Sequence, residues 1–170
     1  PRFVALAMAN VLIGLLVVAA ARAAIPEHRI SGLPGWDHEL PSKQYSGFIS
    51  AEKTPTPGHE KMLHYVFVEA ENDPEDAPVV LWTNGGPGCS SLEGWMMEMG
   101  PLRPDETDPT GRRLARNPLT WNLHANMLYL EHGVGVGFSY SNGGDVHLDD
   151  ESDAEMVQLF LRNFFFVSHL

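Results

Sequence analysis

Short apolar runs, separated by turns rich in proline, glycine and aspartate, predict a series of strands after the first two dozen residues. Residues 44–50 and 62–69 carry the aromatic and β-branched side chains that are typical of strands. The T-P-T-P-G sequence at residues 54–58 can only be a loop, so these two runs predict an antiparallel hairpin. Residues 79–82 and 126–131 are nearly continuous apolar runs without alternation, which is typical of strands covered on both faces.

Two helices are predicted to accompany these strands. One spans residues 91–99 and closes at Gly100 and Pro101. The other begins in a cluster of carboxylates at residues 149–155, which complement the positive end of a helix dipole. Its apolar positions, interrupted by Asn163, recur at steps of three and four residues, which indicates an amphipathic helix packed on a core. Strands that alternate with helices favour an α/β architecture with a largely parallel central sheet.

Composition narrows the class of protein. The chain has 170 residues, of which 44% are hydrophobic, and this content is too high for a disordered chain. Its 11 basic and 22 acidic residues give a formal net charge of −11, so nucleic acid is not an expected partner. The single cysteine, Cys89, cannot build a disulfide scaffold or a cysteine-ligated metal site. These properties predict one acidic globular domain, or a piece of one.

The N-terminal segment predicts entry into the secretory pathway. The first residue is Pro1 and not Met, so the chain is expected to lack its natural start. Residues 3–21 are almost wholly apolar and end in the A-R-A sequence at residues 21–23, which has the pattern of a signal-peptidase site. We predict a signal peptide over residues 1–23; an uncleaved anchor is the alternative, because the run nearly reaches a spanning length. In an oxidising compartment, Cys89 suggests a partner outside the chain, with a buried free thiol as the alternative.

The most informative feature is the N-G-G-P-G sequence at residues 84–88, directly after the apolar run of residues 79–82. Glycines let the backbone turn sharply and present N–H groups that can stabilise an oxyanion; a tight turn without a ligand is the alternative. The G-V-G-V-G sequence at residues 133–137 lacks the spacing of a dinucleotide-binding loop. His59 and His64 are one residue too far apart for a zinc-binding helix. No metal or cofactor is expected, and the other histidines are interpreted as surface or loop residues.

The wider sequence around the glycines carries a family resemblance. Residues 82–91 have the sequence W-T-N-G-G-P-G-C-S-S, and residues 98–101 have the sequence E-M-G-P. This strongly resembles the serine carboxypeptidase family, which includes cathepsin A and has the pattern W-x-N-G-G-P-G-C-S-S followed by E-x-G-P. The resemblance covers residues 44 to about 166. Further agreement lies in Q-Y-S-G-F at 44–48, H-Y at 64–65, F-V-E at 67–69, N-P at 117–118, W-N at 121–122, A-N at 125–126 and G-V-G-F-S-Y-S at 135–141.

The resemblance implies an α/β-hydrolase fold, with antiparallel strands before a mostly parallel sheet, and removal of the C-terminal residue from peptides or proteins. Gly86 matches the glycine whose N–H forms half of the oxyanion hole, and Gly85 shapes the same turn. Asn84 and Glu98 match the pair that hydrogen-bonds the C-terminal carboxylate of the substrate, with Trp82 behind them. A glutamate that faces a carboxylate must hold a proton to donate, so such a site favours acidic pH.

The resemblance also bears on the cysteine, the compartment and one loop. Cys89 matches a cysteine that in the family forms a disulfide with one far downstream, outside this chain. The implied location is the vacuole or lysosome, or the extracellular space, with no membrane partner after signal cleavage. The sequence at residues 131–140 departs from the family's E-S-P-A-G-V-G-F-S-Y, because proline is lost and His132 is gained. This departure puts the substrate preference in doubt and leaves the resemblance intact.

The nucleophile of the family is absent from this chain. The family's serine lies in G-E-S-Y-A-G, and no G-x-S-x-G sequence occurs here. A triad of Ser139, Asp153 and His169 is rejected, because it would have to form within a few dozen residues. We interpret residues 24–170 as the N-terminal part of a serine carboxypeptidase domain, expected to be inactive alone, poorly stable and with an unpaired sheet edge. The alternatives are an acyltransferase with the same acyl-enzyme chemistry and a non-catalytic secreted binding protein of the same fold.

Overall fold

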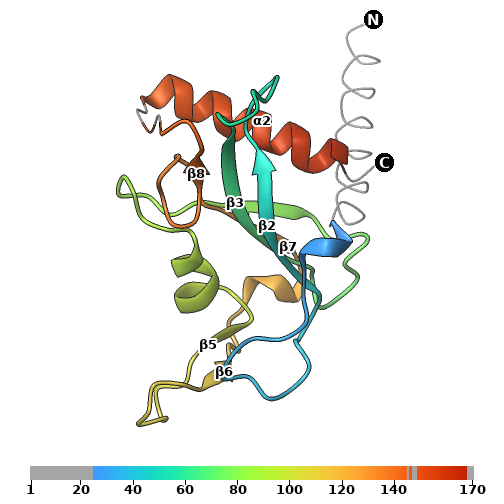
Figure 1. Ribbon diagram of the computed structural model, residues 1–170. Coiled ribbons are helices and arrows are strands. Elements are labelled where there is room, and N and C mark those ends of the chain that lie inside the picture. Colours follow the sequence, from blue (N-terminus) through green and yellow to red (C-terminus); the bar gives the residue numbers. More distant parts are fainter. Residues whose placement is uncertain (1–24, 145, 147–148, 168–170) are drawn as a thin grey trace, which may run out of the picture.

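The sheet is organised around a long antiparallel hairpin of two strands, β2 (Gln44–Ser50) and β3 (Lys61–Val68). The two strands pair along the whole of β2, from Gln44 opposite Val68 to Ser50 opposite Met62. The predicted hairpin is therefore confirmed. The computed structural model describes residues 25–144, 146 and 149–167 (Figure 1), so the predicted signal peptide and His169 lie outside the described residues.

Four further strands join the hairpin to give the order β1-β2-β3-β7-β4, with β8 also paired to β3. They are β1 (Arg29–Ile30), β4 (Val79–Trp82), β7 (Asn126–Leu130) and β8 (Tyr140–Ser141). In this sheet only the β4–β7 pairing is parallel, and the other described pairings are antiparallel. The part of the sheet that these residues form is thus mixed: it holds the expected N-terminal antiparallel strands and one parallel pair.

Strand β4 lies at the edge of the described sheet, although its apolar sequence predicted a strand covered on both faces. Its only neighbour among the described strands is β7, and 38% of Leu81 is exposed. Strand β7 lies between β3 and β4, and all of its residues are buried. The prediction for β4 is wrong in these residues, because the burial of a strand depends on neighbours that its own sequence does not encode. Within the described residues, β4 has no strand on its outer side, in agreement with the expected unpaired edge.

One face of the sheet is covered by helix α2 (Asp150–Val167), which lies across the upper part of the molecule in Figure 1. Asp149 and Ser152 cap its start reciprocally, since each backbone N–H donates to the side chain of the other residue. Asn163 donates its Nδ2 hydrogen to the carbonyl of Ser50 at 2.8 Å, which explains a polar residue in the apolar stripe. The core on this face joins helix residues Met156, Phe160 and Phe164 to Tyr45, Ile49, Leu63, Tyr65, Phe67, Leu128 and Leu130.

The other face is covered by a short helical turn, η2 (Gly94–Glu98), which has π geometry and follows a turn at Ser91 and two helical residues, 92–93. The predicted helical segment at residues 91–99 is thus confirmed, and its central turn is a π-helix instead of the expected α-helix. Trp95 is buried and donates its indole N–H to Gln44 Oε1 at 3.1 Å. Trp95 and Met99 form a second core with side chains from β3 and β7, namely Val66, Val68, Met127 and Tyr129.

A small second sheet of β5 (Leu102–Pro104) and β6 (Leu114–Arg116) lies at the end of the molecule opposite α2 (Figure 1). The sequence predicted only a loop over residues 104–111, because strands of three residues are too short to show a periodic pattern. Two 3₁₀ turns, η1 (Pro26–His28) and η3 (Trp121–Leu123), complete the elements. Within the described residues, no helix combines the length and apolar character needed to cross a bilayer.

The packing of α2 on the hairpin predicts a large effect at Phe160, which is 0% exposed, stacks against Phe164 and meets Tyr65 edge to face. Truncation of Phe160 to alanine leaves a cavity between helix and sheet, so we expect F160A to lower the free energy of unfolding by about 3–5 kcal/mol. Phe166, on the same helix, is 62% exposed. F166A is therefore the matched control, and we expect it to change the free energy of unfolding by less than about 0.5 kcal/mol. Urea unfolding of both variants measures the difference, and equal losses would contradict the assignment of the apolar face.

Candidate active site

Two loops that follow parallel strands meet at one edge of the sheet. Strands β4 and β7 run in the same direction, so residues 83–93 and 131–139 leave the sheet at the same edge. The Ser91 hydroxyl joins them, because it accepts from the N–H of Asn84 at 3.0 Å and donates to the carbonyl of Leu130 at 2.6 Å. In open α/β sheets this edge, at the carboxyl ends of the strands, is where ligands bind.

The glycine-rich turn presents backbone donors toward solvent. Gly85 and Gly86 are exposed, and their N–H groups donate no hydrogen bond within the described part of the chain. The Gly86–Pro87 peptide bond is cis, and Gly88 has a φ of +95°, a conformation that glycine adopts without steric cost. The turn therefore offers free N–H groups of the kind an oxyanion hole requires, and the role of Gly86 and Gly85 stays a prediction.

Trp82, Asn84 and Glu98, which the resemblance grouped, form one hydrogen-bonded chain. The indole N–H of Trp82 donates to Asn84 Oδ1 at 2.9 Å, and Asn84 Nδ2 donates to Glu98 Oε1 at 3.0 Å. The N–H of Gly94 also donates to Asn84 Oδ1. A Cβ at Gly94 would lie 2.4 Å from Trp82 Nε1, so only glycine fits there. The amide of Asn84 is therefore held in one orientation, and the exposed carboxyl of Glu98 projects beside it.

The buried carboxylate of Glu131 connects the two loops to the hairpin. It accepts hydrogen bonds from the Ser90 hydroxyl, from the Phe138 N–H at 2.9 Å and from His64 Nδ1 at 2.9 Å. Burial raises the pKa of Glu131, but the hydrogen bonds from His64, Ser90 and the Phe138 N–H outweigh it and hold the pKa below the ordinary value. Nε2 of His64 lies 2.8 Å from Ser46 Oγ, so this polar chain continues into β2.

His64, for which the sequence predicted no polar partner, is buried and only 6% exposed. Its neighbours Leu63 and Tyr65 face α2, so the side chain of His64 lies on the opposite face of the sheet, where it meets the Glu131 carboxylate. The sequence pattern gave no sign of this partner, because the two residues are 67 positions apart. A histidine inside an otherwise apolar strand was the available signal, since such a buried polar group requires a partner.

The loop after β7 is shaped by glycines at positive φ, at positions 133, 135 and 137. A Cβ on Gly137 would lie 1.8 Å from Glu131 Oε1, which explains the need for glycine at that position. Ser139, the rejected nucleophile, is buried; its hydroxyl donates to the Glu131 carbonyl at 2.6 Å and accepts from the His64 N–H at 2.9 Å. Its hydroxyl therefore serves to fix the loop.

A cavity of about 240 Å³ lies between the glycine-rich turn and the start of α2. Asn84 and Gly85 line one side, and His132 and Asp153 line the other, where His132 Nδ1 and Asp153 Oδ2 are 2.7 Å apart. The sequence marked His132 as a departure near the site but missed its pairing with Asp153. This contact depends on how α2 is docked on the sheet, which no local pattern encodes.

Cys89 lies at the rim of the same cavity as an exposed free thiol. Its predicted disulfide with a cysteine outside this chain stays a prediction. Among the described residues, no three histidine, cysteine or carboxylate side chains are grouped so that they could hold a metal ion.

Comparisons with known proteins identify the family. A family model described as serine carboxypeptidase matches residues 34–169, and the chain belongs to this family. It is 44% identical over 161 residues to the lysosomal protective protein of Mus musculus, covering 94% of this chain and 32% of that protein. It is 38% identical over 168 residues to serine carboxypeptidase-like 21 of Arabidopsis thaliana, covering 96% of this chain and 32% of that protein. The chain thus spans about a third of the length of these relatives.

The fold is shared with a solved structure. The crystal structure of Kex1(Δ)p, a prohormone-processing carboxypeptidase from Saccharomyces cerevisiae, matches with a TM-score of 0.70 and 24% sequence identity. The match covers 85% of this chain and 33% of the yeast chain. The predicted α/β-hydrolase fold class is confirmed, and the sheet described above corresponds to part of that fold.

The close approach between residue 137 and Glu131 predicts that G137A is strongly destabilising. The added methyl group must displace the carboxylate that joins the loops, so we expect a loss of about 3 kcal/mol or more in the free energy of unfolding. Gly144 also has a positive φ, +72°, but a Cβ there meets no atom within 4 Å. G144A therefore isolates the backbone cost, expected to be about 1 kcal/mol. Denaturant unfolding that gave similar losses for both variants would refute the steric explanation.

The depressed pKa of Glu131 predicts a pH-dependent difference between wild type and E131Q. A carboxyl whose pKa is lower in the folded state than its ordinary 4.5 stabilises the fold above pH 4.5, and this contribution is lost as the pH falls through the folded-state pKa. We expect E131Q to be less stable by about 3 kcal/mol near neutral pH, and the gap to narrow below pH 4.5. Urea unfolding across pH measures this gap, with E75Q, at an exposed glutamate, as the control. A gap independent of pH would count against a charged Glu131.

Proposed function

We propose that this chain supplies the oxyanion turn and the carboxylate-binding residues of a serine-type carboxypeptidase. The observation that supports this most directly is the hydrogen-bonded chain from Trp82 through Asn84 to Glu98, located beside the free N–H groups of Gly85 and Gly86. This arrangement lies at the carboxyl ends of two parallel strands, in a chain that belongs to the serine carboxypeptidase family.

The proposed reaction is hydrolysis of the last peptide bond through an acyl-enzyme. A serine outside this chain attacks the scissile carbonyl, and the N–H of Gly86 donates to the oxygen as its negative charge develops. One such donor is worth about 3–4 kcal/mol in the transition state, and the other half of the hole must come from outside these residues. The amine of the departing C-terminal residue takes up a proton, and water then releases the acyl group.

Asn84 and Glu98 are proposed to bind the C-terminal carboxylate and so to select the end of a peptide. Asn84 Nδ2 has two hydrogens, and only one is needed for Glu98 Oε1, so the second is available to the substrate. Glu98 can donate to a carboxylate only when it carries a proton, which would suit an acidic compartment of the secretory pathway. Peptide and protein C-termini are accordingly the proposed substrates.

The chain by itself is proposed to be inactive. It contains no G-x-S-x-G sequence, and the hydroxyl of Ser139 is already bonded to backbone groups within the fold. In the full-length protein, release of C-terminal residues at acidic pH that is abolished by a serine-directed inhibitor would support the peptidase. Acyl transfer to alcohols without release of amino acids, or no turnover at all, would favour the two alternatives. Peptidase activity of the 170-residue chain would contradict the proposal for the fragment.

The role of Glu98 predicts that binding of a peptide acid weakens as the pH rises, and that E98Q removes this dependence. The glutamine keeps an oxygen that accepts from Asn84 Nδ2 and has an N–H₂ group that donates at every pH. We expect affinity of the wild-type chain for N-acetyl-Phe-Leu to fall about tenfold or more from pH 5 to pH 7, and that of E98Q to stay nearly constant.

Titration calorimetry of the peptide acid and of its C-terminal amide measures both effects, because the amide lacks the carboxylate. The matched control is E93Q, at an exposed glutamate just before the η2 turn, which should retain the pH dependence of the wild type. Wild-type affinity that is the same for acid and amide, or flat with pH, would exclude this role for Glu98.

A further inference from the structure

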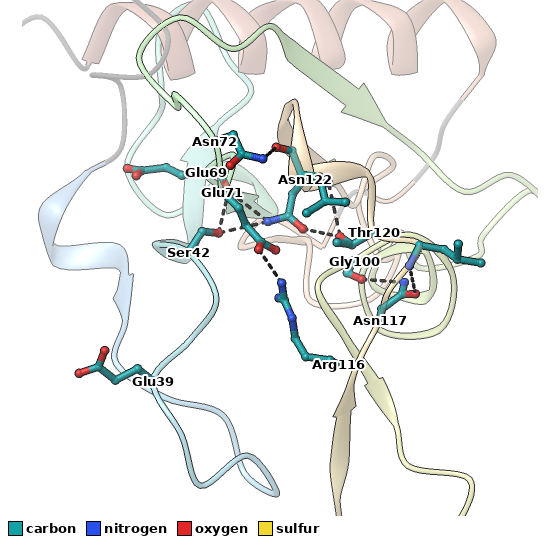
Figure 2. Close-up of polar contacts among 12 residues, drawn as sticks. Glu39, Ser42, Glu69, Glu71, Asn72, Gly100, Arg116, Asn117, Thr120 and Asn122 are labelled. Atoms are coloured by element: carbon teal, nitrogen blue, oxygen red, sulfur yellow. Dashed lines mark hydrogen bonds and ion pairs between the residues drawn. The ribbon is translucent and has the colours of Figure 1, made fainter.

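The end of the η2 turn, which carries Glu98, is held by the side chain of Asn117. Asn117 Nδ2 donates to the carbonyl of Glu98 at 3.0 Å and to the carbonyl of Gly100 at 2.9 Å (Figure 2 shows the bond to Gly100). The backbone N–H of Asn117 donates to Pro101 O at 2.9 Å, and its Oδ1 accepts from the N–H of Leu119. Carbonyls at the end of a helical turn lack partners within the turn, so these bonds determine where the turn ends.

The same segment binds the remaining carbonyl and contacts the other half of the carboxylate-binding chain. The hydroxyl of Thr120 and the N–H of Trp121 both donate to Met99 O at 3.0 Å. The indole of Trp121 meets that of Trp82 edge to face, with ring centroids 5.7 Å apart. Trp82 in turn donates to Asn84 Oδ1. Residues 117–121 therefore contact both the backbone of the turn that carries Glu98 and the indole that orients Asn84.

Buried polar contacts fix this segment to the main sheet. Asn122 is fully buried; its Oδ1 shares the single hydrogen of the Thr120 hydroxyl with Met99 O, and its Nδ2 donates to Ser42 Oγ and to the Glu69 carbonyl. Its carbonyl accepts from the N–H of Glu71 at 2.8 Å. Figure 2 shows these contacts gathered around Asn122, with Thr120 between Asn122 and the Asn117–Gly100 pair. The segment is thus attached to the residues that follow β3 and to Ser42, just before β2.

From this geometry we infer that Asn117 and Thr120 are positioning residues for the carboxylate-binding site: they hold the backbone of the η2 turn so that Glu98 faces Asn84. The inference rests on the proposed function of Glu98. Asn117 is 3% exposed, so its bonds to the turn are shielded from water, and a lost donor would leave carbonyls without a partner. Glu98 itself is exposed, and among the described residues its side chain forms a hydrogen bond only with Asn84, so the backbone supplies most of its placement.

The test compares N117D and T120V with the wild-type chain. N117D keeps the acceptor for Leu119 but replaces the N–H₂ donor by an oxygen that faces two carbonyls, and T120V removes one hydroxyl with little change in shape. The control is N72A, because Asn72 is exposed and bonds Leu123 O in the same network without contact to the η2 turn. T120V provides a usable variant if N117D does not fold.

Two readouts are needed, and neither is a measure of stability. The first is the ratio of affinities for N-acetyl-Phe-Leu and its C-terminal amide at pH 5, which reports on recognition of the carboxylate. The second is the indole N–H resonance of Trp82 without ligand, which reports on the Trp82–Asn84 hydrogen bond. We expect N117D and T120V to lower the acid-to-amide ratio about tenfold and to shift the Trp82 resonance, while amide affinity and N72A stay at wild-type values.

The outcomes separate the inference from the function on which it rests. If the wild type prefers the acid and both folded variants keep that preference with an unmoved Trp82 resonance, the positioning role is wrong and the proposed function stands. If N72A lowers the acid-to-amide ratio as much as N117D does, any disturbance of this hydrogen-bond network weakens carboxylate recognition, and the positioning role of Asn117 and Thr120 is also wrong. If the wild type shows no preference for the acid, the proposed function fails, and the inference fails with it.

Discussion

The buried carboxylate of Glu131 is the group on which the arrangement of the loops depends. A charged group at 0% exposure is tolerated only when it is paired and hydrogen-bonded, and here the Ser90 hydroxyl, the Phe138 N–H and His64 provide the partners. These three come from the glycine-rich segment after β4, the loop after β7 and the hairpin strand β3. A single anion therefore holds the two loops in one position relative to strand β3.

The rest of the site is built outward from these loops by polar contacts more than by apolar packing. Ser91 joins the start of the glycine-rich turn to the end of β7, and the amide of Asn84 is held by Trp82 and Gly94. Such directional bonds fix the orientation of a side chain, which packing of apolar groups does less well. A site that must present donors to an oxyanion and to a carboxylate at set positions requires this kind of order.

Two glycines have the same physical purpose at opposite ends of the site. Gly94 leaves room for the indole of Trp82, and Gly137 leaves room for the carboxylate of Glu131, since a Cβ at either position would lie closer than any non-bonded contact allows. The free N–H groups of Gly85 and Gly86 are a different use of glycine, in which exposure of the backbone is the function. Glycine content in this chain therefore reflects the space that functional side chains occupy, as well as turn formation.

Local patterns in the sequence determined the hairpin of β2 and β3, strand β7, the amphipathic helix α2 and the glycine-rich turn, because each depends on periodicity or turn residues within a few positions. Motif resemblance also grouped Trp82, Asn84 and Glu98. Only the tertiary structure decided the edge position of β4, the burial of His64 against Glu131 and the pairing of His132 with Asp153. These depend on which segments dock together across dozens of residues, and the electrostatic and steric terms that select such contacts have no local signature in the chain.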